Sequence, residues 1–322
     1  MSGGDPRISV VTATFNRAGR LERLLEGLRR QTLSATEFEV VVVDDASADT
    51  TRRLLEATEA DGTLPLHAIY HERNTGRAQA REDGWREARA ELIAFTDDDC
   101  VPAPDWLEAA LRASTANPGT IVQGRTDPDP AELDRLGPFA RTISVTAYDA
   151  GLQTCNIVYP RRTLEAVGGF DTEAFGRVHG SEDSDLGWRA IEHEGARVVF
   201  ADDVRVHHAV NQLGPVGKLR LAAGWSMLAY ARHPELRRAH FARGPFWKPT
   251  HLWLARALAA ALLPRRLWPL SLWLLYPYAR SVYARGKLEG GGVPLAPYFV
   301  LYDLAELRSA LRESVRHRTL MI

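Results

Sequence analysis

The chain is short of cysteine and of long apolar runs, and each shortage argues against a class of protein. Its 322 residues include only two cysteines, Cys100 and Cys155, too few for a disulfide framework or for a metal site built on thiolates. The most apolar segments, residues 251–263 and 267–278, are each shorter than the ~20 residues that a membrane-spanning helix needs. Joined, they would place two arginines in mid-bilayer, which is costly. We therefore expect neither a disulfide-stapled domain nor a transmembrane anchor.

The N-terminus lacks the apolar core of a signal peptide. Its polar start, residues 1–6, runs directly into an apolar segment. We therefore expect a cytoplasmic protein, either free or held on the inner face of the plasma membrane.

Acidic residues are scarce in the last third of the chain and abundant before it. Residues 1–210 contain 23 Arg, no Lys and 36 Asp plus Glu, a net charge of −13, whereas residues 211–322 contain 17 Lys plus Arg and five acids, a net charge of +12. The overall charge of −1 conceals this division. Such asymmetry predicts an acidic part and a basic part with different partners.

The first hundred residues alternate between strand and helix patterns. Four short segments rich in β-branched residues are each separated by a segment with helical spacing, which predicts a parallel sheet with right-handed crossovers. The predicted strands are residues 8–14, 38–43, 66–70 and 92–95, and the predicted helices are around residues 21–28, 50–59 and 78–90. A further helix at 105–116 and a strand at 120–123 follow, and then a loop or lid at 127–134.

Polar residues gather where the first four predicted strands end. In a parallel sheet the carboxyl ends of the strands share one edge, where ligands bind near a topological switch point. These residues are Thr14 and Asn16, then Asp44 and Asp45, then Asn74 and Gly76, and finally Asp97, Asp98 and Asp99. The set therefore predicts a ligand site at this edge.

Three consecutive aspartates, Asp97 to Asp99, end the last of these strands. Their mutual repulsion needs compensation, and a hard divalent cation such as Mg²⁺ or Mn²⁺ suits carboxylate oxygens together with substrate phosphates. The alternative for the triplet alone is a solvated loop that caps the helix after Pro104. The polar residues at the neighbouring strand ends favour the cation.

The motifs VTATFNR (residues 11–17), VVDDAS (42–47), NTG (74–76) with Ala80-Arg81, and FTDDD (95–99) resemble, in this order, the signature of family 2 glycosyltransferases with the GT-A fold. The resemblance implies a Rossmann-like, mostly parallel sheet flanked by helices, a nucleotide-sugar donor and a divalent cation. It places the donor nucleotide on Ala13, Thr14, Phe15, Asn16, Asp45, Asn74, Gly76, Arg81, Asp97 and Asp98, and the metal on Asp99 and Asp97. Ala13, Phe15 and Glu82 depart from the family pattern, so UDP, GDP and dTDP all stay open.

A second group of motifs continues the resemblance through residues 151–156, 161–162, 168–171 and 182–189. From the residues alone, Glu182 and Asp183 suit the first turn of a helix capped by Ser181. The resemblance makes Asp183 the general base that takes the proton of the acceptor hydroxyl in an inverting transfer, with Glu182 orienting the acceptor. It further implies an acceptor site formed by Asn156, Gly169, Asp185, Trp188 and Arg189.

Two histidines end the predicted strand at 204–208 and supply a further candidate metal ligand. If Val204 and Val206 face the core, period-two alternation puts His208 on their face and His207 on the other. The residues favour His208 over His207. The alternative is that one histidine is exposed and the other is satisfied by a backbone carbonyl.

Tryptophan, tyrosine and arginine are interleaved in residues 247–287, between the two apolar segments and around them. This composition is typical of a helical hairpin lying on an anionic membrane surface. The alternative is a helical subdomain that packs on the rest of the chain or forms a homo-oligomer. Nucleic acid is not an expected partner, because the aromatic residues alternate with long aliphatic runs.

We therefore predict a GT-A catalytic domain at residues 1–210, with a nucleotide-sugar part at 7–125 and an acceptor part at 126–210, followed by a basic helical region at 211–322. The expected activity is metal-dependent transfer of one sugar to a hydroxyl acceptor, free or lipid-linked, in polysaccharide, glycolipid or natural-product glycan assembly. The alternative is a non-catalytic scaffold subunit that binds the nucleotide-sugar. The chain lacks the Gln-x-x-Arg-Trp motif of processive synthases and the Gly-rich N-terminal loop of pyrophosphorylases. We therefore expect neither of these two activities.

Overall fold

The structure, a computed structural model, describes residues 5–176, 180–288 and 295–322. The first four residues of the polar start and residues 177–179 and 289–294 lie outside the described residues. The chain divides into two compact units. The first consists of residues 1–133, 142–178 and 182–209, and the second of residues 134–141, 179–181 and 210–322.

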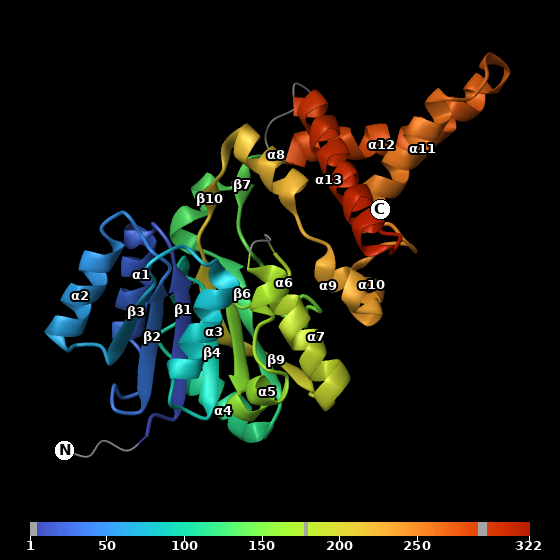
Figure 1. The fold of residues 1–322 in the computed structure, drawn as a ribbon. Coiled ribbons are helices and arrows are strands. Elements are labelled where there is room, and N and C mark those ends of the chain that lie inside the picture. Colours follow the sequence, from blue (N-terminus) through green and yellow to red (C-terminus); the bar gives the residue numbers. More distant parts are fainter. Residues whose placement is uncertain (1–4, 177–179, 289–294) are drawn as a thin grey trace. The chain divides into compact units, whose positions relative to one another are not determined.

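The first unit is built on an eight-stranded sheet with the order β3-β2-β1-β4-β8-β6-β9-β5 (Figure 1). Neighbouring strands in the run β3-β2-β1-β4 are parallel, as are β6 and β9, whereas β8 is antiparallel to β4 and β6, and β5 is antiparallel to β9. The strands are β1 (Ile8–Thr14), β2 (Phe38–Asp44), β3 (Leu66–Tyr70), β4 (Leu92–Thr96), β5 (Cys100–Pro102), β6 (Ile121–Pro128), β8 (Asn156–Pro160) and β9 (Val198–His208). The expected mostly parallel sheet and its first four strands are confirmed.

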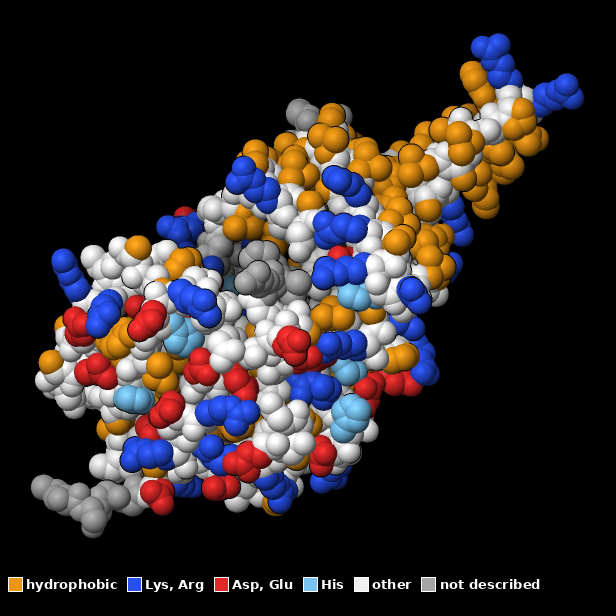
Figure 2. All heavy atoms as spheres, in the orientation of Figure 1, with side chains coloured by type: hydrophobic (Ala, Val, Ile, Leu, Met, Phe, Trp, Pro, Cys, Tyr) orange, Lys and Arg blue, Asp and Glu red, His pale blue; other side chains and the backbone are white. Residues whose placement is uncertain are grey.

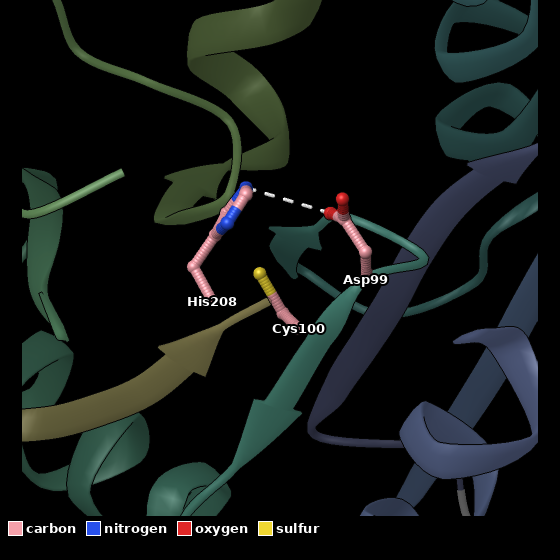
Figure 3. A group of neighbouring side chains, drawn as sticks. All are labelled: Asp99, Cys100 and His208. Atoms are coloured by element: carbon pink, nitrogen blue, oxygen red, sulfur yellow. Dashed lines mark ion pairs between the residues drawn. The ribbon is translucent and has the colours of Figure 1, made fainter. Parts of the chain in front are cut away.

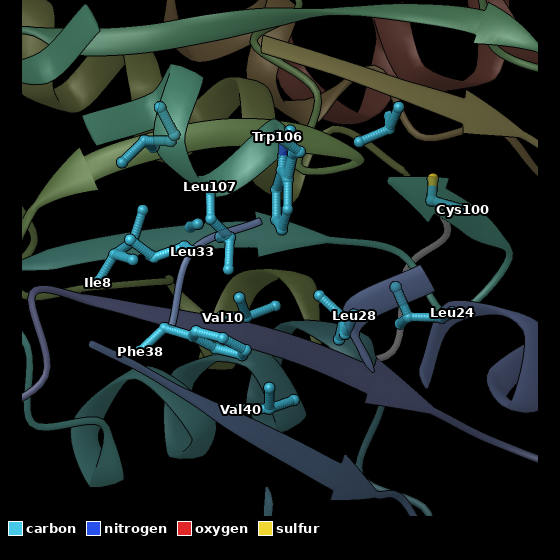
Figure 4. Packing of buried hydrophobic residues seen from close by; sticks show 14 of the residues in the cluster. Ile8, Val10, Leu24, Leu28, Leu33, Phe38, Val40, Cys100, Trp106 and Leu107 are labelled. Carbon is cyan, nitrogen blue, oxygen red and sulfur yellow. The ribbon is translucent and has the colours of Figure 1, made fainter. Parts of the chain in front are cut away.

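Helices flank this sheet. They are α1 (Ala18–Arg29), α2 (Thr51–Asp61), α3 (Arg77–Glu87), α4 (Trp106–Ala116), α5 (Arg161–Ala166), α6 (Thr172–Phe175) and α7 (Glu182–Glu194), with the short helix η1 (Pro130–Arg135). Strand β2 is buried along its whole length, as expected for a parallel strand covered on both faces. Leu24 and Leu28 of α1 pack with Val10, Val40 and Trp106 in the main core (Figure 4).

Two local predictions are wrong. Helix α3 ends at Glu87 and not at residue 90, because the backbone N–H of Arg89 donates to Glu39 and that of Ala90 to the hydroxyl of Ser9. Residues 127–134 are not a free loop. Strand β6 continues to Pro128, and η1 follows, tied to α1 by arginine and carboxylate pairs.

The second unit is helical apart from the short antiparallel pair β7 (Ala140–Arg141) and β10 (Asn211–Gln212). Its helices are α8 (Gly214–Gly224), α9 (Leu228–Arg232), α10 (Pro234–His240), α11 (Pro249–Ala261), η2 (Arg265–Leu267), α12 (Trp268–Leu288) and α13 (Ala296–His317). Leu254, Tyr278 and Val282 pack with Phe299 and Leu307 of α13 in a separate core. The predicted helical C-terminal region is therefore confirmed.

Helices α11 and α12 pair as a hairpin with η2 at the turn. Hydrophobic side chains cover its surface, and basic side chains lie at its end (Figure 2). Among the described residues, no helix combines the length and apolar character needed to cross a bilayer.

Candidate active site

The carboxyl end of β2 is joined to the loop before α3 through Asp45. Its carboxylate accepts hydrogen bonds from the backbone N–H groups of Thr75 and Gly76, both at 2.8 Å, and from the Thr75 hydroxyl at 2.9 Å. His71 Nδ1 lies 2.8 Å from the same carboxylate. Burial opposes ionisation of Asp45, but these hydrogen bonds outweigh it and lower its pKa. Asp45 therefore fixes the loop that contains Asn74 and Gly76. The side-chain amide of Asn74 donates to the backbone carbonyl of Asp45, and the backbone N–H of Gly76 donates to its carboxylate.

Gly76 occupies a position that requires glycine. Its φ is +93°, and a Cβ atom there would lie 2.4 Å from the carbonyl oxygen of Gly176. Gly76 immediately precedes α3, so this close approach sets where Arg77 and Arg81 begin to project from the helix.

Four residues that were predicted to contact the donor nucleotide lie at the end of β1. Thr14 is buried, and its hydroxyl donates to Asp98 Oδ2 at 2.9 Å. Asn16 has a left-handed backbone with φ of 53°, and its side-chain oxygen accepts from the N–H of Ala48 at 2.7 Å. Asn16 thus ties two strand-end loops together. Ala13 is partly buried. Phe15 is 44% exposed at the edge of the sheet where β1 to β4 end, which we call the rim, and its planar ring is available there for stacking.

The three aspartates are paired with two arginines: Arg17 contacts Asp98 and Asp99, and Arg81 contacts Asp97. Arg17 Nη1 lies 3.0 Å from Asp98 Oδ1 and 3.2 Å from Asp99 Oδ2. Arg81 Nη2 donates to Asp97 Oδ1 at 2.7 Å. Burial raises the pKa of Asp98 to about 6, although the charge of Arg17 opposes this. Burial also disfavours ionisation of Asp97, but Arg81 outweighs it and lowers the pKa.

Arg81 connects the aspartates to the start of α7. Its Nη1 donates to Glu182 Oε1 at 2.8 Å, and Arg77 Nε lies 2.6 Å from the same oxygen. Burial alone would lower the pKa of Arg81, but the carboxylates of Asp97 and Glu182 raise it. The guanidinium thus stays charged between two carboxylates from distant parts of the sequence.

Asp183 is the carboxylate whose ionisation the site opposes most clearly. Burial and then the adjacent charge of Glu182 raise its pKa to about 7, against the opposing effect of Arg81 and Arg77. Asp183 accepts a hydrogen bond from the N–H of Ser184 at 2.8 Å, whereas the hydroxyl of the expected cap Ser181 donates to the carbonyl of Ser226 at 3.4 Å. A carboxylate that titrates near neutral pH suits proton abstraction.

His208 has the geometry of a metal ligand. Strand register pairs it with Cys100 across β9 and β5, and its Nε2 lies 3.5 Å from Asp99 Oδ1 (Figure 3). Its Nδ1 lies 2.9 Å from the carbonyl oxygen of Ala209, a contact that holds the ring and directs Nε2 toward the carboxylate.

Among the described residues, the single group with metal-ligand spacing consists of Asp99, Cys100 and His208. As the alternation along the strand indicates, His208 is buried with Val204 and Val206. His207 lies on the other face and outside this group, and Asp97 faces Arg81. The geometry therefore brings Asp99 and His208 together and leaves His207 and Asp97 outside this group.

The predicted acceptor residue Asn156 is instead part of the scaffold. Its side chain is 1% exposed, its oxygen accepts from Trp106 Nε1 at 2.9 Å, and its nitrogen donates to the carbonyls of Arg125 and Val204 at 2.8 Å. Both polar atoms of this amide are therefore hydrogen-bonded within the protein.

The other predicted acceptor contacts also have internal roles. Arg189 pairs with the fully buried Asp185 at 2.8 Å and donates to the carbonyls of Val167 and Gly169, both at 2.7 Å. Trp188 is buried and donates to the carbonyl of Ala150 at 2.8 Å. A Cβ atom on Gly169 would lie 2.2 Å from a carboxylate oxygen of Glu82. The four residues therefore position α7 and the loop before it, and their role toward an acceptor stays a prediction.

Arg17, His71 and Arg77 were not assigned by sequence reasoning, although each contacts the predicted site. A signal for Arg77 was present, because it lies four residues before Arg81 and therefore on the same face of α3. Arg17 and His71 had no comparable signal, since their carboxylate partners lie on other strands.

The site lies in a fold shared with known sugar transferases. Residues 9–162 match the family model described as Glycosyl transferase family 2. A validoxylamine A glucosyltransferase of Streptomyces hygroscopicus is 32% identical over 223 residues, 58% of this chain and 52% of that relative. The chain thus spans about half the length of this curated relative.

Two solved structures resemble most of the chain. The mannosyltransferase PcManGT of Pyrobaculum calidifontis, in complex with GDP-Man and Mn²⁺, has a TM-score of 0.65 and 23% identity and covers 94% of this chain and 88% of its own. S. aureus TarS in complex with UDP-GlcNAc has a TM-score of 0.55 and 18% identity and covers 97% and 92%. Both likenesses show the fold.

The sheet and the carboxylate rim define a GT-A glycosyltransferase domain. Residues 9–162, just under half of the chain, are thus similar to glycosyl transferase family 2.

Proposed function

We propose that the protein is an inverting, metal-dependent glycosyltransferase that moves one sugar from a nucleoside-diphosphate sugar to a hydroxyl acceptor. The observation that carries this proposal is Asp183, whose pKa is raised to about 7 beside the chain of charges Glu182, Arg81 and Asp97. This arrangement gives one carboxylate that can take a proton near Asp97, whose pKa Arg81 lowers.

In this proposal Asp183 acts on the acceptor, and Asp99 and His208 act on the diphosphate of the donor through a cation. Asp183 takes the proton of the acceptor hydroxyl as its oxygen attacks the anomeric carbon from the face opposite the nucleotide. Asp99 and His208 fit a divalent cation, Mn²⁺ or Mg²⁺, which when bound stabilises the negative charge of the departing diphosphate. Arg17 and Arg81 are close enough to the aspartates to contact the same diphosphate oxygens.

The donor is proposed as a UDP-, GDP- or dTDP-sugar. PcManGT holds GDP-Man and TarS holds UDP-GlcNAc, so relatives with this fold use different bases. Thr14 and Asp98 join the ends of β1 and β4 under the rim, and the exposed ring of Phe15 lies at the same strand end. We place the nucleoside along this rim, with Asn74 and Gly76 on its far side.

The acceptor is proposed as a hydroxyl of a polysaccharide, glycolipid or natural-product glycan. The validoxylamine relative is named for a small natural product, which favours this class without defining the acceptor here. The residues that contact the acceptor lie outside the set derived from the motifs, because Asn156, Gly169, Asp185, Trp188 and Arg189 are used internally.

Donor binding and turnover test the proposal together. A thermal-shift screen of UDP, GDP and dTDP, each with and without Mn²⁺, should identify one nucleotide that raises the melting temperature, because it binds only the folded state. Release of the nucleotide from the matching donor should then be lost in Asp183→Asn and kept in Asp203→Asn, a matched control at an exposed carboxylate of β9.

A shift with no nucleotide would overturn the donor site. Nucleotide binding together with equally negligible turnover in wild type and Asp183→Asn, for every donor of the identified base, would favour the scaffold alternative.

We also propose that an anionic membrane surface is a partner through the hairpin of α11, η2 and α12. Trp268, Leu272, Tyr276 and Tyr283 form one stripe along α12 and are 58–71% exposed. Leu262 beside the turn is 87% exposed. Exposed apolar side chains gathered in this way mark an interaction surface.

Charge selects a lipid surface as the occupant. Residues 236–288 contain ten Lys plus Arg and no Asp or Glu. Arg265 and Arg266 at the tip would be costly inside the hydrocarbon, so we place the hairpin flat in the interface, with its aromatic residues at headgroup depth.

Co-sedimentation of the full chain with vesicles tests the membrane surface. Vesicles of phosphatidylcholine with phosphatidylglycerol should bind wild type, and the double change Arg265→Glu/Arg266→Glu should weaken binding about 30-fold or more. The control Arg52→Glu/Arg53→Glu makes the same charge change at an exposed pair on α2 and should bind normally.

Two results would count against the membrane surface. One is that wild type stays in the supernatant at low salt. The other is a lipid-independent dimer that Trp268→Ser/Trp273→Ser converts to a monomer, which would assign the hairpin to a homo-oligomer.

A further inference from the structure

The side chain of Cys100 points into the space between Asp99 and His208. Figure 3 shows its sulfur facing the gap between the imidazole and the carboxylate. One ligand atom from each of the three residues lies within 4.8 Å of the other two, and all three residues are buried. The proposed catalysis needs only the carboxylate and the imidazole, so the thiol has no assigned function.

Strand pairing fixes this arrangement of thiol and imidazole. Cys100 begins β5 and is the direct register partner of His208 at the end of β9, so both side chains lie on one face of the sheet. Asp99 comes from the turn immediately before β5. The β5 and β9 pairing therefore holds the backbone of Cys100 beside His208.

Each of the other two ligand atoms is directed toward the same point. Arg17 contacts Asp99 Oδ2, and Oδ1 is the oxygen that faces His208. The Ala209 carbonyl beside Nδ1 of His208 turns Nε2 inward. The oxygen and nitrogen are 3.5 Å apart, as expected for two ligands ~2.0–2.2 Å from one ion. A sulfur about 2.3 Å from the same ion is compatible with a group whose three ligand atoms lie within 4.8 Å of one another.

We propose that Cys100 is a third ligand of this cation site, so that the site prefers zinc-type ions to Mg²⁺ and Mn²⁺. The inference rests on the proposed function for the location of the site and adds its metal selectivity. Thiolate sulfur is a soft donor that suits Zn²⁺, Co²⁺ and Cd²⁺, whereas Mg²⁺ and Mn²⁺ prefer oxygen. On binding, the thiol proton passes to solvent as the bond from sulfur to metal forms.

Cadmium titration of the full-length protein tests this directly, because a bond from thiolate to Cd²⁺ produces an ultraviolet charge-transfer band that oxygen and nitrogen ligands do not. We expect wild type to develop this band with one Cd²⁺ per chain and Cys100→Ser to lack it. The matched control is Cys155→Ser, which changes the chain's other buried cysteine and should keep the band. Cys100→Ser should bind Cd²⁺ at least about tenfold more weakly than Cys155→Ser.

A second variant separates loss of a ligand from loss of folding. Cys100→Ala leaves a small apolar side chain in the core, and its melting temperature and circular dichroism report the fold. A band that persists in Cys100→Ser, or no band in wild type, would overturn the proposal. Mn²⁺ binding measured by electron paramagnetic resonance should be unchanged within about twofold in Cys100→Ala. If wild type binds Mn²⁺ but shows no charge-transfer band with Cd²⁺, only the thiol ligand is rejected. If wild type does not bind Mn²⁺ at all, the metal site itself is rejected.

Discussion

At the scale of single residues, Asp183 is held in an environment that opposes its negative charge. Burial and Glu182 raise its pKa to about 7, while Arg81 and Arg77 prevent a larger shift. A base with this pKa is half ionised near neutral pH and still strong enough to accept a proton.

We predict that the transfer rate depends on pH through this carboxylate. Activity should fall as pH decreases below about 7, because the protonated carboxyl cannot accept the hydroxyl proton. Asp183→Asn should lower kcat by about 10²–10⁴-fold and leave nucleotide binding nearly unchanged. The measurement is kcat/KM from pH 5 to 9, and a flat profile would show that another group is the base.

We predict that the same residue limits stability at high pH. The pKa of an unfolded aspartate is ~3.9, so between about pH 4 and pH 7 the folded state binds more protons at Asp183 than the unfolded state does. The free energy of unfolding contributed by this residue therefore decreases as pH rises through that window. At pH 8, Asp183→Asn should be more stable than wild type by about 1–3 kcal/mol in denaturant unfolding. Equal stabilities at pH 8 would contradict this.

At the scale of elements, helix α7 is attached to the preceding loop through Arg189. Its guanidinium joins the buried Asp185 to the carbonyls of Val167 and Gly169. Both Glu182 and Asp183 lie at the start of this helix, so the attachment positions the proposed base.

We predict that Arg189→Met destabilises the fold by about 3–5 kcal/mol, because Asp185 is left buried without its guanidinium partner. The control Arg112→Met removes an exposed pair with Asp203 and should cost no more than about 1 kcal/mol. Urea unfolding measures both. Unchanged stability of Arg189→Met with a higher acceptor KM would instead support the predicted acceptor role of Arg189.

Sequence patterns were sufficient for β1 to β4, because buried β-branched runs and strand-end carboxylates depend on residues close in the chain. They also favoured His208, through alternation along β9. They did not reveal the internal hydrogen bonds of Asn156, whose partners Trp106 and Val204 lie on other elements. A polar residue in a motif does not reveal whether its hydrogen bonds are already used inside the protein.

At the scale of the whole molecule, charge is divided between residues 1–210 and residues 211–322, at −13 and +12. The acidic part contains the proposed cation site, and the basic part contains the hairpin. The negative charge of the acidic part thus suits the proposed cation, and the positive charge of the basic part suits the proposed anionic membrane surface.

We predict that binding to anionic vesicles weakens several-fold between about 0.05 M and 0.5 M salt, because the Debye length shortens below ~10 Å. Weak binding to neutral phosphatidylcholine should be nearly independent of salt, since it depends on apolar and aromatic contacts. Flotation assays measure both. Salt-independent binding to anionic vesicles would assign the attraction to the apolar side chains alone.

The pairing of β5 with β9 also determines when the proposed cation site is completed. Asp99 is synthesised long before His208, so a nascent chain that ends between them presents the acidic triplet without its imidazole. Tight and selective capture of the ion must wait until β9 has entered the sheet. If the proposed site binds its cation, binding is expected late in biogenesis and would distinguish completed molecules from partially folded ones.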